Sequence, residues 1–407
     1  MALQIITRDN ADVDTLSLSA GTDLFIATGV NLTGRGWTLI DSWSQNVGVF
    51  VSAGARLSGE VGVIRLTDTT KADKWIEIEQ GARVSGDSYG ASLSGDRFEF
   101  KNAGQVTGGA NGMIYALSDP SHGGTIENSG QIIGGNNALM CNFGDETGTL
   151  AVTNSGLIWG GSFAIAGASG VAYRITNSGT FRGVVELGNQ NDVVNNVGGK
   201  IAGNIMFKAG NDVYNGSGGR LTGNIFAGAG NDTLRGGVDN DFFNGGSDND
   251  KLYGGKGADT LNGDDGNDIL QGDDGNDILN GGDGIDTLYG GLGKDTLTGG
   301  AAKDTFVFKS VRDSTVASTG RDIIKDFARA DAEKVDLKLI DASTKASGDQ
   351  EFTFIGIQAF HKVAGELRYE IKSGDTYISG DVNGDGVADF TIVLDLSLAM
   401  RSSDFIL

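Results

Sequence analysis

The 407-residue sequence contains one cysteine, one proline and two histidines. The lone Cys141 excludes an intramolecular disulfide framework, and we expect it to be a small buried side chain. The two histidines, His122 and His361, are too few for the H-E-x-x-H helix of a zinc protease, and with one cysteine they make a nucleophilic triad hard to assemble. We expect His361 to be an exposed structural residue.

Basic residues and long apolar runs are also scarce. The chain has 31 Lys and Arg against 53 Asp and Glu, so its formal charge of -22 argues against nucleic acid as a partner and in favour of cations. No apolar run is long enough to predict a transmembrane helix. Residues 1–16 lack the pattern of a cleaved secretory signal peptide, so an exported chain would need a signal elsewhere.

Glycine, by contrast, is abundant, with 68 residues, and much of it belongs to a nine-residue repeat. One aspartate recurs in each repeat, at Asp232, Asp241, Asp250, Asp259, Asp268, Asp277, Asp286, Asp295 and Asp304. A large apolar residue follows each aspartate two positions later, from Leu234 to Phe306. This pattern predicts six turn positions followed by a three-residue strand that points one apolar side chain inward.

A softer period near 25 residues precedes the nine-residue repeat. Its units alternate apolar residues, then have a polar turn with glycine and another short strand, and their turn glycines are Gly54, Gly81, Gly104, Gly130, Gly156 and Gly179. Such a period without helical patterning is typical of a parallel β-helix. Asparagines recur before the turns at Asn102, Asn128, Asn154 and Asn177, and we expect them to stack as a hydrogen-bonded ladder.

The two periods merge between residues 183 and 235, where related segments place Asp192, Asp212 and Asp232 twenty residues apart. We therefore expect no flexible linker there. The predicted fold class is all-β: a right-handed parallel β-helix that continues into a calcium-binding parallel β-roll and then a small β-rich C-terminal domain. The predicted domains are a cap over 1–25, the β-helix over 26–226, the β-roll over 227–307 and the C-terminal domain over 308–407.

The calcium prediction follows from the chemistry of the nine-residue turns. Two units make one eighteen-residue coil, so turns eighteen residues apart stack about 4.8 Å from each other. An ion between stacked turns would meet carboxylate and carbonyl oxygens from both, which are the flexible hard ligands of calcium rather than zinc. Counting the gaps between aspartates predicts about seven ions, with one or two more near Asp192 and Asp212. Without cations, repulsion and glycine entropy should leave the repeats unfolded.

Residues 227–307 resemble the RTX, or haemolysin-type, calcium-binding repeats, whose nonapeptide G-G-x-G-x-D-x-U-x they match. Segments after Asp304, including "DTFVFKS", "GRDIIKDF" and "EKVDLKLIDA", resemble the C-terminal domain of serralysin-type secreted proteases. The final "SSDFIL" resembles the terminus that type I exporters recognise. These resemblances imply calcium binding in a β-roll, export by a type I secretion machinery and an extracellular location.

A further calcium loop is one of two interpretations of "DVNGDGVAD". Asp381, Asn383, Asp385 and Asp389 have EF-hand-like spacing, with Gly386 at the centre, but Ile392 stands where the bidentate glutamate belongs. An ordinary hairpin turn rich in Asp, Asn and Gly would look the same. Both interpretations stay open.

The sequence favours a structural or adhesive protein of an extracellular surface, matrix or self-assembling layer, with calcium and the secretion machinery as partners. The alternative is a polysaccharide lyase or mannuronan-epimerase-like enzyme acting on acidic glycans. The segment "YALSDPSHGG" is faintly similar to the site of such epimerases, which makes Tyr115, Asp119 and His122 candidates. A turn between coils is the preferred interpretation of that segment. Four tryptophans could stack on sugars or fill the β-helix: Trp37, Trp43, Trp75 and Trp159.

Overall fold

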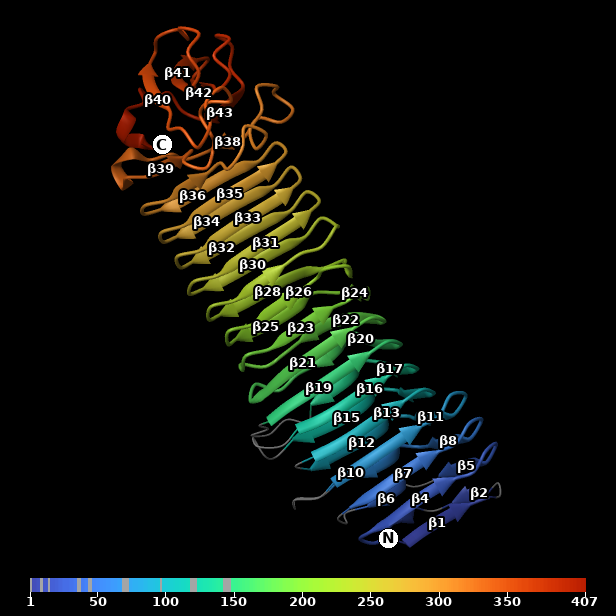
Figure 1. Cartoon of the computed structure of the whole chain (residues 1–407). Helices are drawn as coiled ribbons and strands as arrows, with labels where there is room; N and C mark the ends of the chain where they lie inside the picture. The colour runs from blue at the N-terminus through green and yellow to red at the C-terminus, as the bar shows by residue number, and fades with distance from the viewer. Residues whose placement is uncertain are drawn as a thin grey trace. The chain divides into compact units, whose positions relative to one another are not determined.

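The computed structural model describes residues 2–7, 10–13, 15–34, 38–42, 46–67, 73–95, 97–117, 123–141 and 148–407 (Figure 1). Strands, turns and loops make up nearly all of it, with two short 3-10 helices, η1 (Arg329–Asp331) and η2 (Ser402–Asp404). The chain forms two compact units, Met1–Ile225 and Phe226–Leu407. Each contains stacked parallel strands, which confirms the all-β β-helix and β-roll class predicted from the repeats.

The first unit is a parallel β-helix with three strands in most coils. One sheet contains β1 (Ala2–Ile6), β4 (Thr22–Ile26), β7 (Val47–Val51), β10 (Asp73–Ile78), β13 (Arg97–Asn102), β16 (Gly123–Asn128), β19 (Gly148–Asn154), β21 (Val171–Asn177), β23 (Val193–Asn196) and β26 (Val213–Asn215). Successive strands of this sheet are offset by 24 to 27 residues from β7 to β19 and by 19 and 20 at β23 and β26. Strands β1 to β3 already pair with the next coil.

The other two strands of each coil follow the turn. The first of them is β2 (Asn10–Val13), β5 (Asn31–Gly34), β8 (Arg56–Gly59), β11 (Arg83–Gly86), β14 (Gln105–Gly108), β17 (Gln131–Gly134), β20 (Leu157–Ala166), β22 (Thr180–Glu186), β24 (Lys200–Ala202) and β27 (Arg220–Leu221). The second is β3 (Leu16–Ser17), β6 (Thr38–Ser42), β9 (Gly62–Leu66), β12 (Tyr89–Gly95), β15 (Asn111–Leu117), β18 (Asn137–Cys141) and β25 (Ile205–Ala209), while β20 and β22 are long enough to serve both positions.

The interior of this unit contains the inward-facing apolar side chains of every coil, together with the predicted asparagine ladder. The amide nitrogens of Asn102, Asn128 and Asn154 each donate to the next asparagine's side-chain oxygen over 2.8 Å. The ladder continues one step further than predicted, since Asn177 donates to Asn196 over 2.8 Å. Cys141 is a buried thiol, as predicted.

The second unit begins as a β-roll with two strands in each coil; β28 (Asn224–Ala229) crosses the boundary between the units. One sheet contains β29 (Thr233–Arg235), β31 (Lys251–Lys256), β33 (Ile269–Asp274), β35 (Thr287–Leu292) and β37 (Thr305–Val307). The other contains β30 (Phe242–Ser247), β32 (Thr260–Asp265), β34 (Ile278–Asp283) and β36 (Thr296–Ala301). Pairing joins Leu252 to Leu270 and Leu261 to Leu279, which is an eighteen-residue coil.

The strands of the roll are longer than the three residues that the sequence predicted. Those from β30 to β36 have six residues each and run through the first three glycine-rich positions of the following unit. Glycine does not end them because parallel neighbours supply backbone hydrogen bonds there, as where Gly255 lies opposite Asp273. The turns are therefore shorter than predicted.

The C-terminal segment extends both sheets of the roll. Strands β38 (Ile323–Ile324) and β39 (Lys334–Asp336) pair with β36 and β37, and then with β43 (Phe390–Leu394) and β44 (Phe405–Ile406). An antiparallel meander joins β43 to β42 (Asp375–Asp381) and β41 (Glu366–Lys372), with β40 (Thr353–Gly356) beside β41. None of the helices in the described ranges has the length and apolar character that a bilayer crossing needs.

Candidate metal centre

The nine repeat aspartates occupy equivalent places in the turns of the roll, each immediately before the first paired residue of a strand. All are buried, with at most 5% of the side chain exposed, at Asp241. They form two columns because the turns lie alternately on the two sheets. One column is Asp232, Asp250, Asp268, Asp286 and Asp304, and the other is Asp241, Asp259, Asp277 and Asp295.

One oxygen of these carboxylates holds the columns together. The backbone N–H of Asp250 donates to Oδ1 of Asp268 over 2.7 Å, and the same bond repeats between aspartates eighteen residues apart throughout the roll at 2.7–2.8 Å. Each aspartate therefore fixes the turn before it as well as its own. This supplies a structural reason for aspartate here beyond its charge.

In seven of these aspartates the other oxygen has no hydrogen-bond donor within the described part of the chain, whereas in Asp241 it accepts the N–H of Gly237 over 3.1 Å. Oδ2 is buried and unpartnered in Asp250, Asp259, Asp268, Asp277, Asp286, Asp295 and Asp304. A buried carboxylate oxygen without a partner costs free energy, so the site calls for a cation or a proton.

Eight of the nine repeats open with a glycine, and each of these glycines lies against Oδ2 of the aspartate in its own repeat. A Cβ atom on Gly263 would stand 2.2 Å from Oδ2 of Asp268 and 2.5 Å from the carbonyl oxygen of Gly281 in the next turn. A Cβ on Gly272 would stand at similar distances from Oδ2 of Asp277 and the carbonyl of Gly290. A carboxylate of one turn and a carbonyl of the next thus face the same point, which any larger residue would fill.

Burial raises the pKa values of these carboxyl groups, although the N–H donors on Oδ1 oppose the shift. The pKa of Asp250 rises to about 8, and those of Asp277 and Asp286 to about 7, with neighbouring aspartates adding to the effect. At neutral pH a divalent cation would therefore compete with protons for the same oxygens.

The donor set fits calcium. No three Asp, Glu, His or Cys side chains among the described residues come close enough to hold a metal by themselves. An ion between two turns would consequently take one or two carboxylates and complete its shell with backbone carbonyls. Oxygen-only shells of this mixed kind suit calcium and not the nitrogen- and sulfur-binding metals.

Asp192 and Asp212, in the first unit, are joined by the same hydrogen bond as the repeat aspartates, but both oxygens of Asp192 accept hydrogen bonds. The N–H of Asp192 donates to Oδ1 of Asp212 over 2.6 Å. Asp192 itself has donors on both oxygens, the N–H groups of Tyr173 at 2.6 Å and Gly188 at 3.2 Å. Ion binding at this pair stays a prediction.

Sequence reasoning missed two carboxylates that continue the columns. The N–H of Asp295 donates to Oδ1 of Asp322, 27 residues later, over 2.8 Å. Glu333 stands in the place after Asp304, because Lys334 pairs with Thr305. Both side chains are buried and each has one unpartnered oxygen, Oδ2 of Asp322 and Oε1 of Glu333. The detectable signal was the acid-x-apolar triplet, in "DII" and "EKV".

The loop from Asp381 to Asp389 has its oxygens directed to its own backbone. Asp381 accepts the N–H groups of Gly384 at 2.6 Å and Gly386 at 2.8 Å. Asp389 accepts the N–H of Val382 and the amide of Asn383. Asp385 accepts the N–H of Val387. These bonds account for the loop as a polar hairpin turn, and calcium binding there stays a prediction.

The enzymatic candidates are not assembled in the described residues. Tyr115 is fully buried inside the β-helix, and its hydroxyl lies 3.0 Å from that of Tyr173. Asp119 and His122 lie outside the described residues, as do Trp37 and Trp43. His361 is about half exposed and lies 2.7 Å from Glu366 through Nδ1. Tyr115 therefore serves the core and is out of reach of a polymer outside it.

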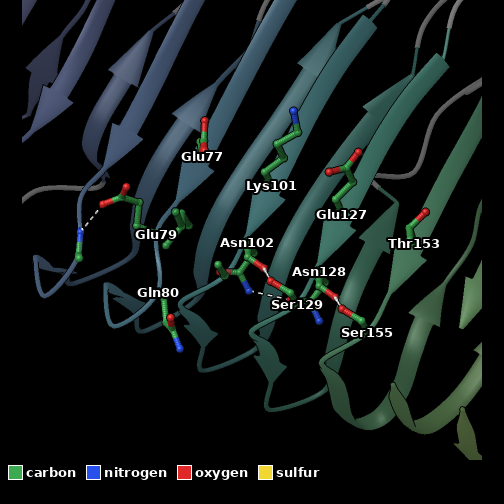
Figure 2. A pocket seen from close by; sticks show the side chains of 13 residues that line it. Glu77, Glu79, Gln80, Lys101, Asn102, Glu127, Asn128, Ser129, Thr153 and Ser155 are labelled. Atoms are coloured by element: carbon green, nitrogen blue, oxygen red, sulfur yellow. Dashed lines mark hydrogen bonds between the residues drawn. The ribbon is translucent and has the colours of Figure 1, made fainter. Parts of the chain in front are cut away.

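A groove of about 520 Å³ runs over the outer face of β10, β13, β16 and β19 (Figure 2). Glu77, Lys101, Glu127 and Thr153 form one row across these strands, as their pairing requires. Glu79, Gln80, Ser129 and Ser155 lie along the turns below the row. Carboxylates outnumber the single lysine in this lining, so the groove carries net negative charge.

Two tryptophans lie on outer surfaces of the β-helix. The indole of Trp75, on β10, covers Gly48, where a Cβ would stand 1.8 Å from the ring. Trp159, on β20, packs under the guanidinium of Arg182, whose central carbon is 4.8 Å from the ring centroid. Neither tryptophan belongs to the core.

Comparison with protein families finds the RTX calcium-binding nonapeptide repeat in four copies, at residues 222–252, 244–279, 253–288 and 271–306. These ranges coincide with the β-roll. No curated protein matches the chain at a significant level.

Two solved structures illustrate the similarity to known folds. The R3 subunit of mannuronan C5-epimerase AlgE6 from Azotobacter vinelandii is 21% identical, with 42% of this chain and 78% of that chain covered, at a TM-score of 0.26. The R2 subunit of the same enzyme is 23% identical, with 41% and 88% covered, at a TM-score of 0.23. At these scores neither likeness bears on what this chain binds or does.

Proposed function

We propose that this chain, which carries RTX calcium-binding nonapeptide repeats over residues 222–306, is an extracellular protein that folds on binding calcium and serves a structural or adhesive role. In this proposal the repeat aspartates hold about seven ions between stacked turns. The chain stays unfolded where free calcium is low, is exported by a type I machinery and folds outside the cell. The β-helix then acts in a surface, matrix or self-assembling layer.

The observation that carries the proposal is the row of buried, unpartnered Oδ2 atoms beside the repeat glycines. Protons compete with a cation for these oxygens around neutral pH, since burial raises the pKa of Asp250 to about 8 and those of Asp259 and Asp268 to about 6. Extracellular calcium modules have dissociation constants on the order of 10⁻⁴ to 10⁻³ M. With such an affinity the repeats would bind calcium outside the cell and stay calcium-free inside it.

A calcium titration of the chelator-stripped protein tests this function. Circular dichroism should report a gain of β structure at millimolar calcium, and light scattering should report whether assembly accompanies it. Magnesium at the same concentration is the control, because its preference for octahedral geometry suits these mixed shells poorly. Full β structure in chelator at pH 8, unchanged by calcium, would rule the proposal out.

The alternative, a lyase or epimerase acting on acidic glycans, is less well supported. The net negative groove over β10 to β19 would repel a polyuronate, and Tyr115 is buried. Incubating the calcium-loaded protein with alginate- and pectin-like polymers decides between the two functions. Unsaturated or epimerised sugars that disappear in a His122→Ala variant would establish the enzyme; unchanged polymers favour the structural role.

A further inference from the structure

We propose that the calcium columns extend beyond the nonapeptide repeats into the C-terminal segment, where Asp322 and Glu333 supply carboxylate ligands for two further ions. This inference rests on the proposed calcium binding by the repeats and goes beyond it, because the family match ends at residue 306 and the nine-residue aspartate period ends at Asp304.

Asp322 shares the burial, the column hydrogen bond and the strand register of a repeat aspartate. Its Oδ1 accepts the N–H of Asp295 over 2.8 Å, the same bond that joins the repeat aspartates. The strand that follows it is in register, since Ile323 pairs with Thr296 and the buried Ile324 with Leu297. The turn that ends at Asp322 thus stacks on the turn that ends at Asp295, although 27 residues separate the two aspartates.

The gap between these two turns contains uncompensated negative charge. Oδ2 of Asp295 and Oδ2 of Asp322 are both buried and without a hydrogen-bond partner, and Asp322 is fully buried. The charged groups that act most strongly on Asp322 are Asp295, Asp313 and Asp277, all acidic. The nearby cations that form ion pairs are directed elsewhere, Lys325 to Asp395 and Arg329 to Asp404. Two buried carboxyl groups without a counterion call for protons or for a cation, and a cation between them would satisfy both oxygens at once.

Glu333 follows Asp304 in the other column through the same strand register, and its side chain is one methylene longer than aspartate. The N–H of Lys334 donates to the carbonyl of Asp304 over 2.9 Å, and the buried Val335 pairs with Phe306. Oε2 of Glu333 accepts the N–H of Ala328 over 2.7 Å, whereas Oε1 is buried and unpartnered, as is Oδ2 of Asp304. The longer side chain thus keeps one oxygen for its own turn and presents the other to the gap.

Calcium at these two places would order the C-terminal segment as well as the repeats. Strand β38 follows Asp322 and carries β43, and β39 follows Glu333 and carries the terminal β44. An ion at each carboxylate would therefore fix the strands on which the last hundred residues pack. Without the ions, β38 and β44 would keep only two-residue pairings and β39 a three-residue pairing with β37.

The test counts ions in the full-length protein. Equilibrium dialysis against saturating calcium, followed by atomic emission, should find about nine ions in the wild type if two add to about seven in the repeats. Asp322→Asn and Glu333→Gln should each bind one ion fewer, because the amide keeps the shape and loses the charge. Glu333→Asp, which installs the repeats' own residue, should keep the full count. Asp336→Asn, at a partly exposed carboxylate nearby, is the matched control and should also keep it.

A variant within the repeats separates failure of this inference from failure of the proposed function. If Asp268→Asn loses an ion while Asp322→Asn and Glu333→Gln retain all of them, the columns end with the repeats and the inference is wrong. If Asp268→Asn also retains every ion, the repeats themselves do not bind calcium in the proposed way.

Hydrogen exchange of β43 and β44 gives an independent readout. Calcium should slow exchange in these strands of the wild type, and Asp322→Asn and Glu333→Gln should remove that slowing. Slowing that is unchanged in both variants would contradict the inference. If Glu333→Gln fails to fold in calcium, the inference is supported only when Glu333→Asp folds and binds as many ions as the wild type. If neither variant folds, the inference is wrong.

Discussion

Each repeat aspartate combines a structural bond with an unsatisfied charge. In Asp268, Oδ1 accepts the N–H of Asp250 over 2.7 Å while Oδ2 is buried without a partner. The first bond survives replacement by asparagine, whereas the charge does not. The two roles can therefore be separated by a single substitution.

We expect Asp268→Asn to weaken calcium binding while keeping the hydrogen bond from the N–H of Asp250. The variant should need several times more calcium for half-maximal β structure, because an amide is a poorer calcium ligand than a carboxylate. Its structure in chelator should equal or exceed that of the wild type, because a buried repulsive charge is gone. Calcium titration by circular dichroism measures both; an unaltered midpoint would contradict the assignment of Asp268 as a ligand.

The asparagine ladder stabilises the first unit because it provides hydrogen-bond partners for buried side-chain amides. Asn128 accepts from Asn102 and donates to Asn154, both over 2.8 Å. Asn128→Ala leaves both neighbours short of a partner, so we expect a loss of about 2 to 4 kcal/mol in the free energy of unfolding. Gln105→Ala, in the exposed Gln105–Gln131 pair, is the control and should cost less than about 1 kcal/mol. Urea unfolding in saturating calcium measures the difference, and equal costs would mean that the ladder adds nothing.

Six of the nine repeats have glycine at the fourth position, and Gly284 shows how closely the turns approach there. Gly284 has φ 137°, and a Cβ atom there would stand 1.7 Å from the carbonyl oxygen of Gly266 in the preceding turn. Because that contact is with backbone, a side chain can be accommodated only by separating the turns. The close approach of stacked turns therefore sets the distance between the oxygens that would bind an ion.

Gly284→Ala should therefore disturb calcium binding as well as stability. We expect a loss of about 1 to 3 kcal/mol in stability and a reduced affinity at the adjoining gaps. Ile285→Ala, at a neighbouring side chain that is 56% exposed, should have little effect. Thermal unfolding with and without calcium compares the two; a Gly284→Ala protein indistinguishable from Ile285→Ala would show that the turns can separate freely.

For the molecule as a whole, protons and calcium compete for the same buried carboxyl groups. Folding raises the pKa of Asp250 to about 8 and of Asp277 to about 7, from an ordinary value near 4. A carboxyl group with a raised pKa favours the folded state fully below its unfolded pKa and loses that contribution as pH rises through the folded pKa. In chelator the β-roll should thus be most stable below about pH 4 and lose stability up to about pH 8.

Calcium should reverse this dependence. Because calcium binds the ionised carboxylates, the calcium needed for half-maximal folding should rise as pH falls from 8 to 5. Circular dichroism over that range, with chelator and with graded calcium, measures both trends. A calcium midpoint that does not move with pH would mean that the aspartates are not the ligands.

The fold class and the regular site could be derived from sequence because they depend on a fixed period. A nine-residue unit with one aspartate and one apolar residue can bury the apolar side chain only by stacking coils, and stacking brings aspartates eighteen residues apart together. The same logic predicted the asparagine ladder from Asn102 to Asn177. The residues that meet in space are always 18 apart in the aspartate columns and 23 or 26 apart in the asparagine ladder.

Only the tertiary structure decided which residues meet where the period breaks. Asp322 joins its column across 27 residues, Glu333 across a longer insertion, and Tyr115 turns inward to meet Tyr173. The strands of the roll also run on through glycine, which local propensity does not favour, because neighbouring coils supply the hydrogen bonds. The length of an irregular insertion does not predict which residue will lie above a repeat aspartate. The pairing of the strand that follows the insertion determines this, and it places Asp322 and Glu333 in the columns.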